Sequence, residues 1–399
     1  MKKFIFLSIL LPMLAVGQTA VEYYNRAMAE FSYNNSFGAM ENINKAIVLK
    51  ADYADALSYR GYFHHLSKEY DKAIADYLAA DKLKHNVNGY FIACPYAVKG
   101  NTAEAFKWLE VSLSTAENKA VLSAIINDKD LTSLHGDPKW KELINKKWYT
   151  EYEMLMNEGN DKTNAKDLPG ALIAWNKAIA LDSKNDKAYG ARAINHLYQG
   201  NFDKALTDLN EAIRLSPSNS SYFGNRAYVY KELKKNNEAL LDYNKAIQLD
   251  PQNMVYADRA MVKFILNQKD PGVASDLKMY LDCYYKDDFN FYLLGNYYYG
   301  IDNMPEAIKA LDKAISINNQ QGGYYMKRGS AYFISKQNAK AIEDYSAAIQ
   351  LNGKDGEAYY SRGTAKGESR DKVGACEDWR KAQDLGYADP NGYIRDICK

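Results

Sequence analysis

The sequence predicts an all-α fold, a solenoid of antiparallel helix pairs, because one residue pattern returns every 34 positions. Small residues dominate one offset of this period, at Ala171, Ala205, Ala239, Val273, Ala307, Ala341 and Ala375. A second series follows seven residues later, at Ala178, Ala212, Ala246, Tyr280, Ala314, Ala348 and Ala382. Each period also holds two stretches with apolar residues at i, i+3, i+4 and i+7, the spacing of amphipathic helices. One repeated helix-turn-helix unit therefore sets the fold.

The unit that starts at Asp186 shows how two such helices pack. The apolar faces of its two helices are made by Tyr189, Ala193 and His196 and by Ala205, Leu209 and Ala212. Small residues let two helix axes approach closely, and bulkier side chains fill the space that remains. Pro217 lies in the turn after the second helix and stops it.

These positions resemble the signature of the tetratricopeptide repeat (TPR). In the unit of residues 186–219 the matching residues are Tyr189, Arg192, Ala193, Gly200, Phe202, Ala205, Leu209, Ala212 and Pro217. The resemblance covers roughly residues 20 to 389. It implies about ten repeats in a right-handed superhelix, closed by a C-terminal capping helix. It also implies a scaffold for protein-protein interaction.

Residues 1–17 are predicted to be a secretory signal peptide. Lys2 and Lys3 precede an apolar stretch of thirteen residues from Phe4 to Val16, and small residues stand before Gln18. The stretch is short for a membrane-spanning helix, which needs about 20 residues. We therefore expect a mature chain that begins at Gln18, is periplasmic or secreted, and has no stable membrane insertion. The alternative is a retained membrane anchor.

The rest of the chain divides into four predicted segments. Residues 18–119 hold the N-terminal repeats, residues 152–389 hold seven repeats, and residues 390–399 form the capping helix. Residues 120–151 lose the pattern, although Asp137-Pro138 still marks the start of a helix. They are either a degenerate repeat in a continuous superhelix or a junction between two solenoid blocks. The repeat that starts at Met254 also departs from the pattern, and local packing there should be irregular.

The sequence contains no catalytic, cofactor or metal motif that we recognise, and we expect no enzyme activity, cofactor or metal. The five histidines are scattered, and the neighbours His64 and His65 point about 100° apart on a helix, which makes them a poor chelating pair. The formal net charge is +1, and removal of Lys2 and Lys3 makes it −1. Nucleic acid, which requires a basic stripe, is therefore not expected as a partner.

Arginine and aspartate recur sixteen residues apart, at the seventh and twenty-third positions of their repeats. The pairs are Arg60/Asp76, Arg192/Asp208, Arg226/Asp242, Arg328/Asp344 and Arg362/Asp378. The seventh position lies on the first helix and the twenty-third on the second, so each pair is expected to bridge its hairpin. An arginine ladder for an acidic ligand is the functional alternative, but the aspartate that always accompanies the arginine favours the structural role.

In proteins that this chain resembles, the fifth, ninth and twelfth positions of the first helix line a concave groove that binds peptides. Here these positions and the adjacent sixth position offer tyrosines and amides suited to gripping a peptide. The candidates are Asn225, Tyr228, Tyr292, Asn296, Tyr299, Lys327, Phe333 and Tyr360. The alternative is that they only pack between neighbouring first helices. The family's basic pattern for gripping a C-terminal carboxylate is absent apart from Asn225 and Lys327.

Four cysteines in a chain expected to be exported invite disulfide pairing. Cys376 lies on the second helix of the last repeat, and Cys398 ends the predicted capping helix 22 residues later. A cap that folds back would bring the two together, whereas Cys94 and Cys283 lie in distant repeats and should remain buried thiols. Two independent thiols at the C-terminus are the alternative.

The sequence therefore predicts a non-enzymatic protein-binding scaffold of the bacterial envelope that holds a peptide or a helix in its groove. A structural subunit of an envelope or secretion complex that uses its convex face is the first alternative. A cryptic envelope enzyme or glycan binder is a weaker one. The sequence does not identify the partner or the oligomeric state.

Overall fold

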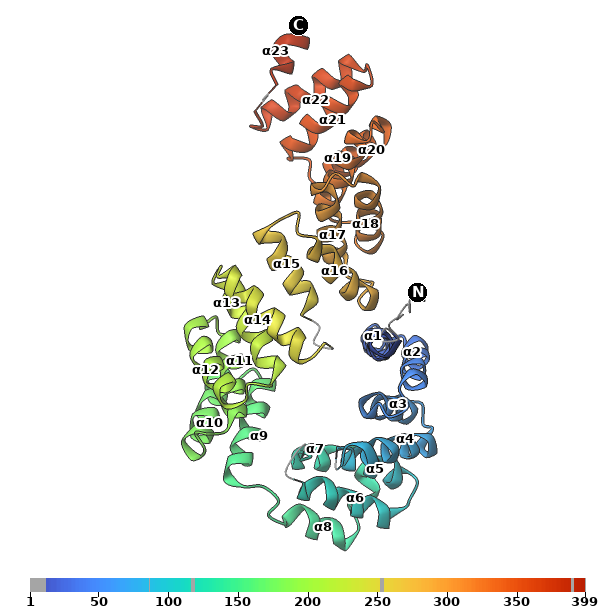
Figure 1. Ribbon diagram of the computed structural model, residues 1–399, viewed down its shortest axis with the longest axis vertical. Coiled ribbons are helices and arrows are strands. Elements are labelled where there is room, and N and C mark those ends of the chain that lie inside the picture. Colours follow the sequence, from blue (N-terminus) through green and yellow to red (C-terminus); the bar gives the residue numbers. More distant parts are fainter. Residues whose placement is uncertain (1–11, 86, 116–118, 252–254, 389–390, 399) are drawn as a thin grey trace, which may run out of the picture. The chain divides into compact units, whose positions relative to one another are not determined.

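The structure, a computed structural model, describes residues 12–398 apart from 86, 116–118, 252–254 and 389–390 (Figure 1). Every regular element in these residues is helical, which confirms the predicted all-α class. The chain forms two compact units, residues 1–217 and residues 218–399. Most of the predicted signal peptide lies outside the described residues. No described helix is both long and apolar enough to cross a membrane.

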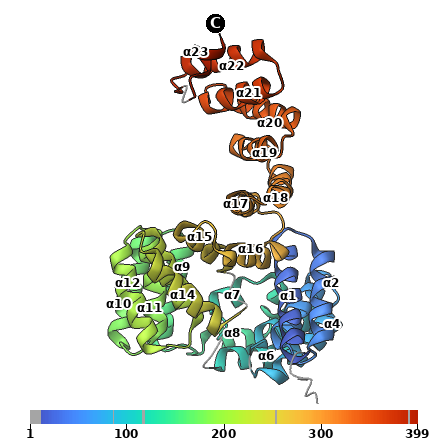
Figure 2. The same cartoon turned by 45° about the horizontal axis from the view of Figure 1, so that its top comes forward.

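The first unit contains twelve α-helices and one 3-10 helix in its described residues. They are α1 (Pro12–Ser32), α2 (Ser36–Leu49), α3 (Ala54–Leu66), α4 (Tyr70–Leu83), α5 (Gly89–Val98), α6 (Thr102–Ser114), α7 (Leu122–Asn127), η1 (Lys129–Leu134), α8 (Pro138–Asn145), α9 (Glu151–Asn164), α10 (Leu168–Leu181), α11 (Asp186–Tyr198) and α12 (Phe202–Leu215). Except around α7 to α8, successive helices pair as hairpins, which Figure 2 shows for α11 and α12.

The second unit contains five hairpins and a short terminal helix in its described residues. They are α13 (Ser220–Glu232) with α14 (Asn236–Leu249), α15 (Tyr256–Leu266) with α16 (Pro271–Cys283), α17 (Asp288–Gly300) with α18 (Met304–Ile317), α19 (Gly322–Ile334) with α20 (Asn338–Leu351), α21 (Gly356–Glu368) with α22 (Lys372–Asp384), and α23 (Tyr393–Ile397). The odd-numbered helices α13 to α21 are the first helices of their repeats and α14 to α22 are the second helices.

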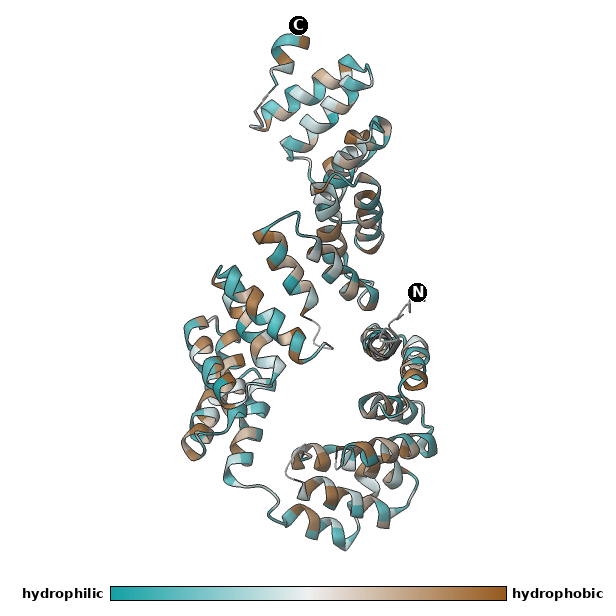
Figure 3. Ribbon diagram, in the orientation of Figure 1, coloured by the Kyte–Doolittle hydropathy of each residue, from teal (hydrophilic) through white to brown (hydrophobic). Residues whose placement is uncertain are grey.

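The cores follow the small-residue pattern. Ala307, Ala314, Ala341 and Ala375 are fully buried, and Ala348 is almost so. The hydropathy colouring shows apolar and polar residues mixed along every helix, as expected for amphipathic helices with one buried stripe (Figure 3). Gly329 permits the closest approach in its repeat, because an added Cβ would lie 2.9 Å from a ring carbon of Tyr345. Each hairpin is therefore held by small residues on one helix and a large ring or leucine on the other.

The two helices of a hairpin are joined by a corner at the fifteenth position of the repeat, where the backbone turns left-handed. At the corner of α19 and α20, Lys336 has φ 59°. The amide of Gln337 then donates to the carbonyl of Tyr332 at 2.9 Å, which closes the helix end. Gly100 and Gly200 hold this corner in two repeats. The other corners, also at positive φ, are Asn34, Lys68, Lys166, Lys234, Asp302 and Arg370.

The predicted arginine-aspartate bridges are confirmed. Arg328 Nε and Nη2 donate to the carboxylate of Asp344 at 2.8 and 2.6 Å, and its Nη1 donates to Asp312 at 2.7 Å. Because Asp312 lies on α18, each guanidinium ties its own second helix to the second helix of the preceding repeat. The irregular repeat also makes the bridge, from Arg259 to Asp276, although the two residues are seventeen apart. Arg259 stands one residue early, and the short helix α15 accommodates the shift.

Residues 120–151 contain the short helices α7, η1 and α8. Asp137 caps α8 by accepting from the amide of Lys139 at 2.9 Å, and Pro138 follows it, as the sequence predicts. Leu131, Leu134 and Trp140 are buried in one cluster with residues of α5 and α6. The segment therefore shares a core with the hairpin that precedes it. Whether it is a degenerate repeat or a junction between two solenoid blocks stays a prediction.

At the C-terminus a disulfide joins Cys376 to Cys398, with 5.5 Å between their Cα atoms. Cys94 and Cys283 are buried thiols. The bridge holds α23 over α22, where Tyr393 packs on Trp379 with ring centroids 4.6 Å apart. Pro390, the first residue of the predicted capping helix, lies outside the described residues, and the described helix begins at Tyr393.

Candidate functional site

The candidate binding residues lie on the first helices of the second unit. We call their surface the first-helix face, defined by Asn225 and Tyr228 on α13, Tyr292, Asn296 and Tyr299 on α17, and Lys327 and Phe333 on α19. Tyr228 is 41% exposed, and the other six are half-buried. These side chains are neither a closed core nor free on the surface, which is the exposure expected of residues that can contact a partner.

Five residues join α17 to α19 on this face. The ring of Tyr292 stacks on the ring of Tyr324, with centroids 4.8 Å apart, and the Tyr324 hydroxyl donates to Asp288 at 2.9 Å. Lys327 Nζ lies 4.6 Å from the centroid of the Tyr299 ring. Burial and then this hydrogen bond raise the pKa of Tyr324, so its hydroxyl remains a donor at neutral pH. The aromatic groups are therefore held in place before any partner arrives.

A small pocket lies beside α13. It has a volume of about 240 Å³, and Asn225, Tyr228, Tyr243 and Asp258 are among its lining residues. Lys231 donates to Asp258 at 2.7 Å and lies 4.6 Å from the centroid of the Tyr228 ring. The hydroxyl of the buried Tyr243 has no hydrogen-bond partner among the described residues. This pocket combines aromatic area with an amide, a carboxylate and an unsatisfied hydroxyl.

Tyr360 differs from the other candidates because it is buried, with 8% of its surface exposed. Tyr387 and Tyr393 pack against its ring, and the side-chain amide of Asn391 donates to its hydroxyl at 2.9 Å. The C-terminal segment thus covers this end of the first-helix face. Phe333 is intermediate, since it packs against the cluster of Ala341, Tyr345 and Ala365.

Sequence reasoning did not select two residues that border this face, Asp258 and Tyr243. Lys231 and Asp258 occupy the twelfth position of one repeat and the fifth of the next, and their opposite charges predict the ion pair that forms. Tyr243 is buried in the core of its repeat, and the structure shows that it also lines the pocket. Tyr345 is the equivalent tyrosine in the repeat of residues 322–355, and its hydroxyl donates a hydrogen bond to Ser330 Oγ at 3.3 Å. Tyr228 stands at the corresponding ninth position beside Tyr243, which explains the missing partner.

The sequence matches profiles of a known repeat family. Sequence profiles of the tetratricopeptide repeat match residues 186–219, 220–253, 290–321 and 323–355. These matches describe a repeat and not a catalytic domain. A search of curated proteins found no matching sequence.

Several solved structures are similar to parts of the chain. A tetratricopeptide repeat protein from Parabacteroides merdae is 23% identical, covers 62% of this chain and 97% of its own, and superposes with a TM-score of 0.43. The C-terminal part of a TPR repeat-containing protein from Cytophaga hutchinsonii is 18% identical, covers 60% and 98%, and has a TM-score of 0.49. MamA from Desulfovibrio magneticus is 20% identical, covers 43% and 96%, and has a TM-score of 0.40.

Proposed function

Because the chain is a tetratricopeptide repeat protein, we propose that it is a non-enzymatic scaffold that binds a peptide segment or a helix of a partner protein on its first-helix face. The observation that carries this proposal is the preorganised pair of contacts between α17 and α19, in which Tyr292 stacks on Tyr324 and Lys327 lies over Tyr299. Rigid aromatic side chains provide large contact area at little cost in conformational entropy. Asn296, half-buried on the same helix, adds a side-chain amide that can donate and accept hydrogen bonds.

The partner that fits this face is an extended segment or a short helix with mixed character. Tyrosine rings favour apolar side chains, whereas Asn225 and Asn296 can bond the backbone of a bound peptide. The pocket beside Tyr228 accepts one side chain, and Asp258 and Tyr243 favour a side chain that carries hydrogen-bond donors. The C-terminal limit of the site is set by Tyr360, which the chain itself covers.

A peptide selection tests this site. Peptides would be selected from a random display library on the immobilised protein, and their affinities measured by fluorescence anisotropy on wild type and on the double variant Tyr292→Ala, Tyr299→Ala. We expect each lost ring to cost more than about 1 kcal/mol of binding free energy. Phe37→Ala is the control, because Phe37 is an exposed aromatic on α2 and lies outside the first-helix face. Helicity and melting temperature should stay close to wild type.

One result would contradict the proposal, and another would require a different variant. Selected peptides that keep full affinity for a folded double variant would place binding on another surface. Loss of helicity in the double variant would show that these tyrosines are structural, and Asn296→Ala, which removes no ring, would then replace it in the binding measurement.

We further propose that the protein acts outside the cytoplasm, in the bacterial periplasm or as a secreted protein. The charged and apolar N-terminal residues support export, and the Cys376–Cys398 disulfide suits an oxidising compartment. N-terminal sequencing of the protein from an envelope fraction should give a chain that begins at Gln18. A chain that begins at Met1 in the same fraction would instead support a retained anchor.

A further inference from the structure

The aromatic residues at the fourth and eleventh positions of the repeats flank an arginine at the seventh position. Tyr325 and Tyr332 lie with ring centroids 5.7 and 5.9 Å from the guanidinium carbon of Arg328. Phe223 and Tyr230 flank Arg226 at 5.7 and 5.9 Å in the same way. The arginine fills the space between two successive second helices and ties them together through its aspartate partners.

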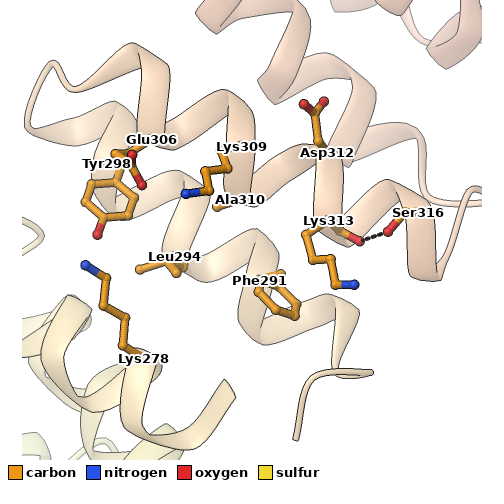
Figure 4. A pocket seen from close by; sticks show the side chains of 10 residues that line it. All are labelled: Lys278, Phe291, Leu294, Tyr298, Glu306, Lys309, Ala310, Asp312, Lys313 and Ser316. Atoms are coloured by element: carbon orange, nitrogen blue, oxygen red, sulfur yellow. Dashed lines mark hydrogen bonds between the residues drawn. The ribbon is translucent and has the colours of Figure 1, made fainter. Parts of the chain in front are cut away.

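The repeat of α17 and α18 keeps the aromatic pair but lacks the arginine and its aspartate. Phe291 and Tyr298 occupy the fourth and eleventh positions, whereas Leu294 stands in the arginine position and Ala310 in the aspartate position. All four residues line a cavity of about 570 Å³, shown in Figure 4. We call it the α16–α18 cleft, because Lys278 of α16 and several residues of α18 complete its wall. A leucine too short to span the gap leaves the cleft open.

The floor of the cleft is apolar and its rim is mainly cationic. Phe291, Leu294 and Ala310 form the floor, and the rim carries Lys278, Lys309 and Lys313 (Figure 4). Lys278 Nζ lies 5.6 Å from the ring centroid of Tyr298, and its hydrogen bond to that residue raises the pKa of Lys278.

Two carboxylates also line the cleft, and one of them is already neutralised. Asp312 pairs with Arg328 at 2.7 Å, which leaves Glu306 against the three lysines. Lys309 and Lys313 form no ion pair within the described part of the chain. The rim therefore carries three lysines against one carboxylate that has no arginine partner, Glu306, and so presents an excess of positive charge.

We propose that the α16–α18 cleft docks an apolar side chain of a partner protein that carries acidic residues on either side of it. A volume of about 570 Å³ lies in the range of pockets that bury a ligand group. Charge complementarity selects acidic neighbours, because a basic segment would meet three like charges. This surface is distinct from the first-helix face, since Phe291, Leu294 and Tyr298 point roughly 130° away from Tyr292, Asn296 and Tyr299 around α17.

Three labelled peptides of one length test the cleft. Each has a central leucine, flanked on both sides by glutamate, by glutamine or by lysine, and binding to the full chain is followed by fluorescence anisotropy. The glutamate-flanked peptide should bind at least about tenfold more tightly than the glutamine-flanked one, and the lysine-flanked peptide should bind most weakly. Equal affinities for the three peptides, or no binding of the glutamate-flanked peptide, would overturn the proposal.

Two variants locate the binding. Leu294→Arg with Ala310→Asp introduces the bridge that the neighbouring repeats contain, fills the cleft, and should weaken the glutamate-flanked peptide at least about tenfold. Lys309→Glu with Lys313→Glu changes only exposed residues and should reverse the preference between glutamate and lysine flanks. Tyr292→Ala with Tyr299→Ala is the control and should leave the affinity unchanged. If the first variant does not fold, the charge reversal alone decides, and an unchanged preference would overturn the proposal.

Discussion

The repeats of residues 288–321 and 322–355 are neighbours that both match the tetratricopeptide profile, yet they differ at the contact between successive repeats. Both turn at a left-handed corner, Asp302 in one and Lys336 in the other, and both bury alanine at the same offsets. Only the second has the arginine that spans three helices. The comparison shows that the 34-residue pattern specifies the hairpin, while the ion pair between repeats is a separate feature that one repeat can lose without losing its fold.

Among the variants that test this comparison, Asp344→Ala should lower the stability of its repeat the most. The change leaves the guanidinium of Arg328, whose side chain is 19% exposed, without its main partner. Removal of one member of a buried pair costs about 3 kcal/mol, because the remaining charge stays desolvated. Hydrogen exchange of the amides in α19 and α20 should report this loss as a lower free energy of local opening.

The double variant Arg328→Leu, Asp344→Ala is the control, because it makes the repeat resemble its neighbour. Replacement of both charges by apolar residues is often close to neutral, so we expect a loss below about 1 kcal/mol. A double variant as unstable as the single variant would show that the ion pair itself, and not the burial of an unpaired charge, stabilises the contact.

A loss of stability of similar or smaller size is expected when the disulfide of the last repeat, which the internal repeats lack, is removed. The last repeat contains the same bridge, from Arg362 to Asp378, and the Cys376–Cys398 disulfide also ties it to the C-terminal segment. Closure of a loop of 22 residues stabilises by roughly 3 kcal/mol in the chain-entropy model. Cys398→Ser should therefore lower protection in α21 and α22 and leave α19 and α20 nearly unchanged. Cys283→Ser, at a buried thiol in another repeat, is the control, and an equal loss of protection in α21 and α22 would contradict this role.

The smallest expected effect is a dependence of stability on pH, and it arises at the eleventh position of the repeat. Tyr298 and Tyr332 occupy this position in the two compared repeats, whereas His196 occupies it in residues 186–219. Burial lowers the pKa of His196 below its ordinary value of 6.5, and the nearby Arg192 and Lys204 lower it further against the opposing effect of Asp208. The unfolded chain thus binds the proton more readily than the folded chain. Stability that is present above pH 6.5 is therefore lost as the pH falls through the lower folded pKa.

Hydrogen exchange of α11 and α12 at pH 7.5 and 5.5, corrected for the intrinsic rate, measures this loss. The repeats with tyrosine at the eleventh position should show no comparable change. His196→Phe keeps an aromatic ring and removes the titration, so a pH-dependent loss that persists in this variant would assign the effect to another group.

Much of this fold could be predicted from the sequence, because the decisive interactions are local and repeated. A spacing of sixteen residues places arginine and aspartate on facing helices, and the bridges form between those residues. The burial of Tyr360 could not be predicted, because the C-terminal segment that covers it has no repeat pattern. In the sequence, the α16–α18 cleft corresponds only to two departures from the repeat pattern, Leu294 in place of arginine and Ala310 in place of aspartate. These departures predict a cleft only once the structure shows that the arginine of other repeats fills the space between successive second helices.

The left-handed corners leave this chain room to become more thermostable. Corners at seven repeats carry a residue other than glycine, although this conformation disfavours an L residue by about 1 kcal/mol or more. Glycine removes that strain but costs conformational entropy in the unfolded chain, so each replacement should gain only a few tenths of a kcal/mol. The corners lie in different repeats, so the gains should add. Replacing the corner residues with glycine one at a time should therefore raise the stability of the protein in small steps.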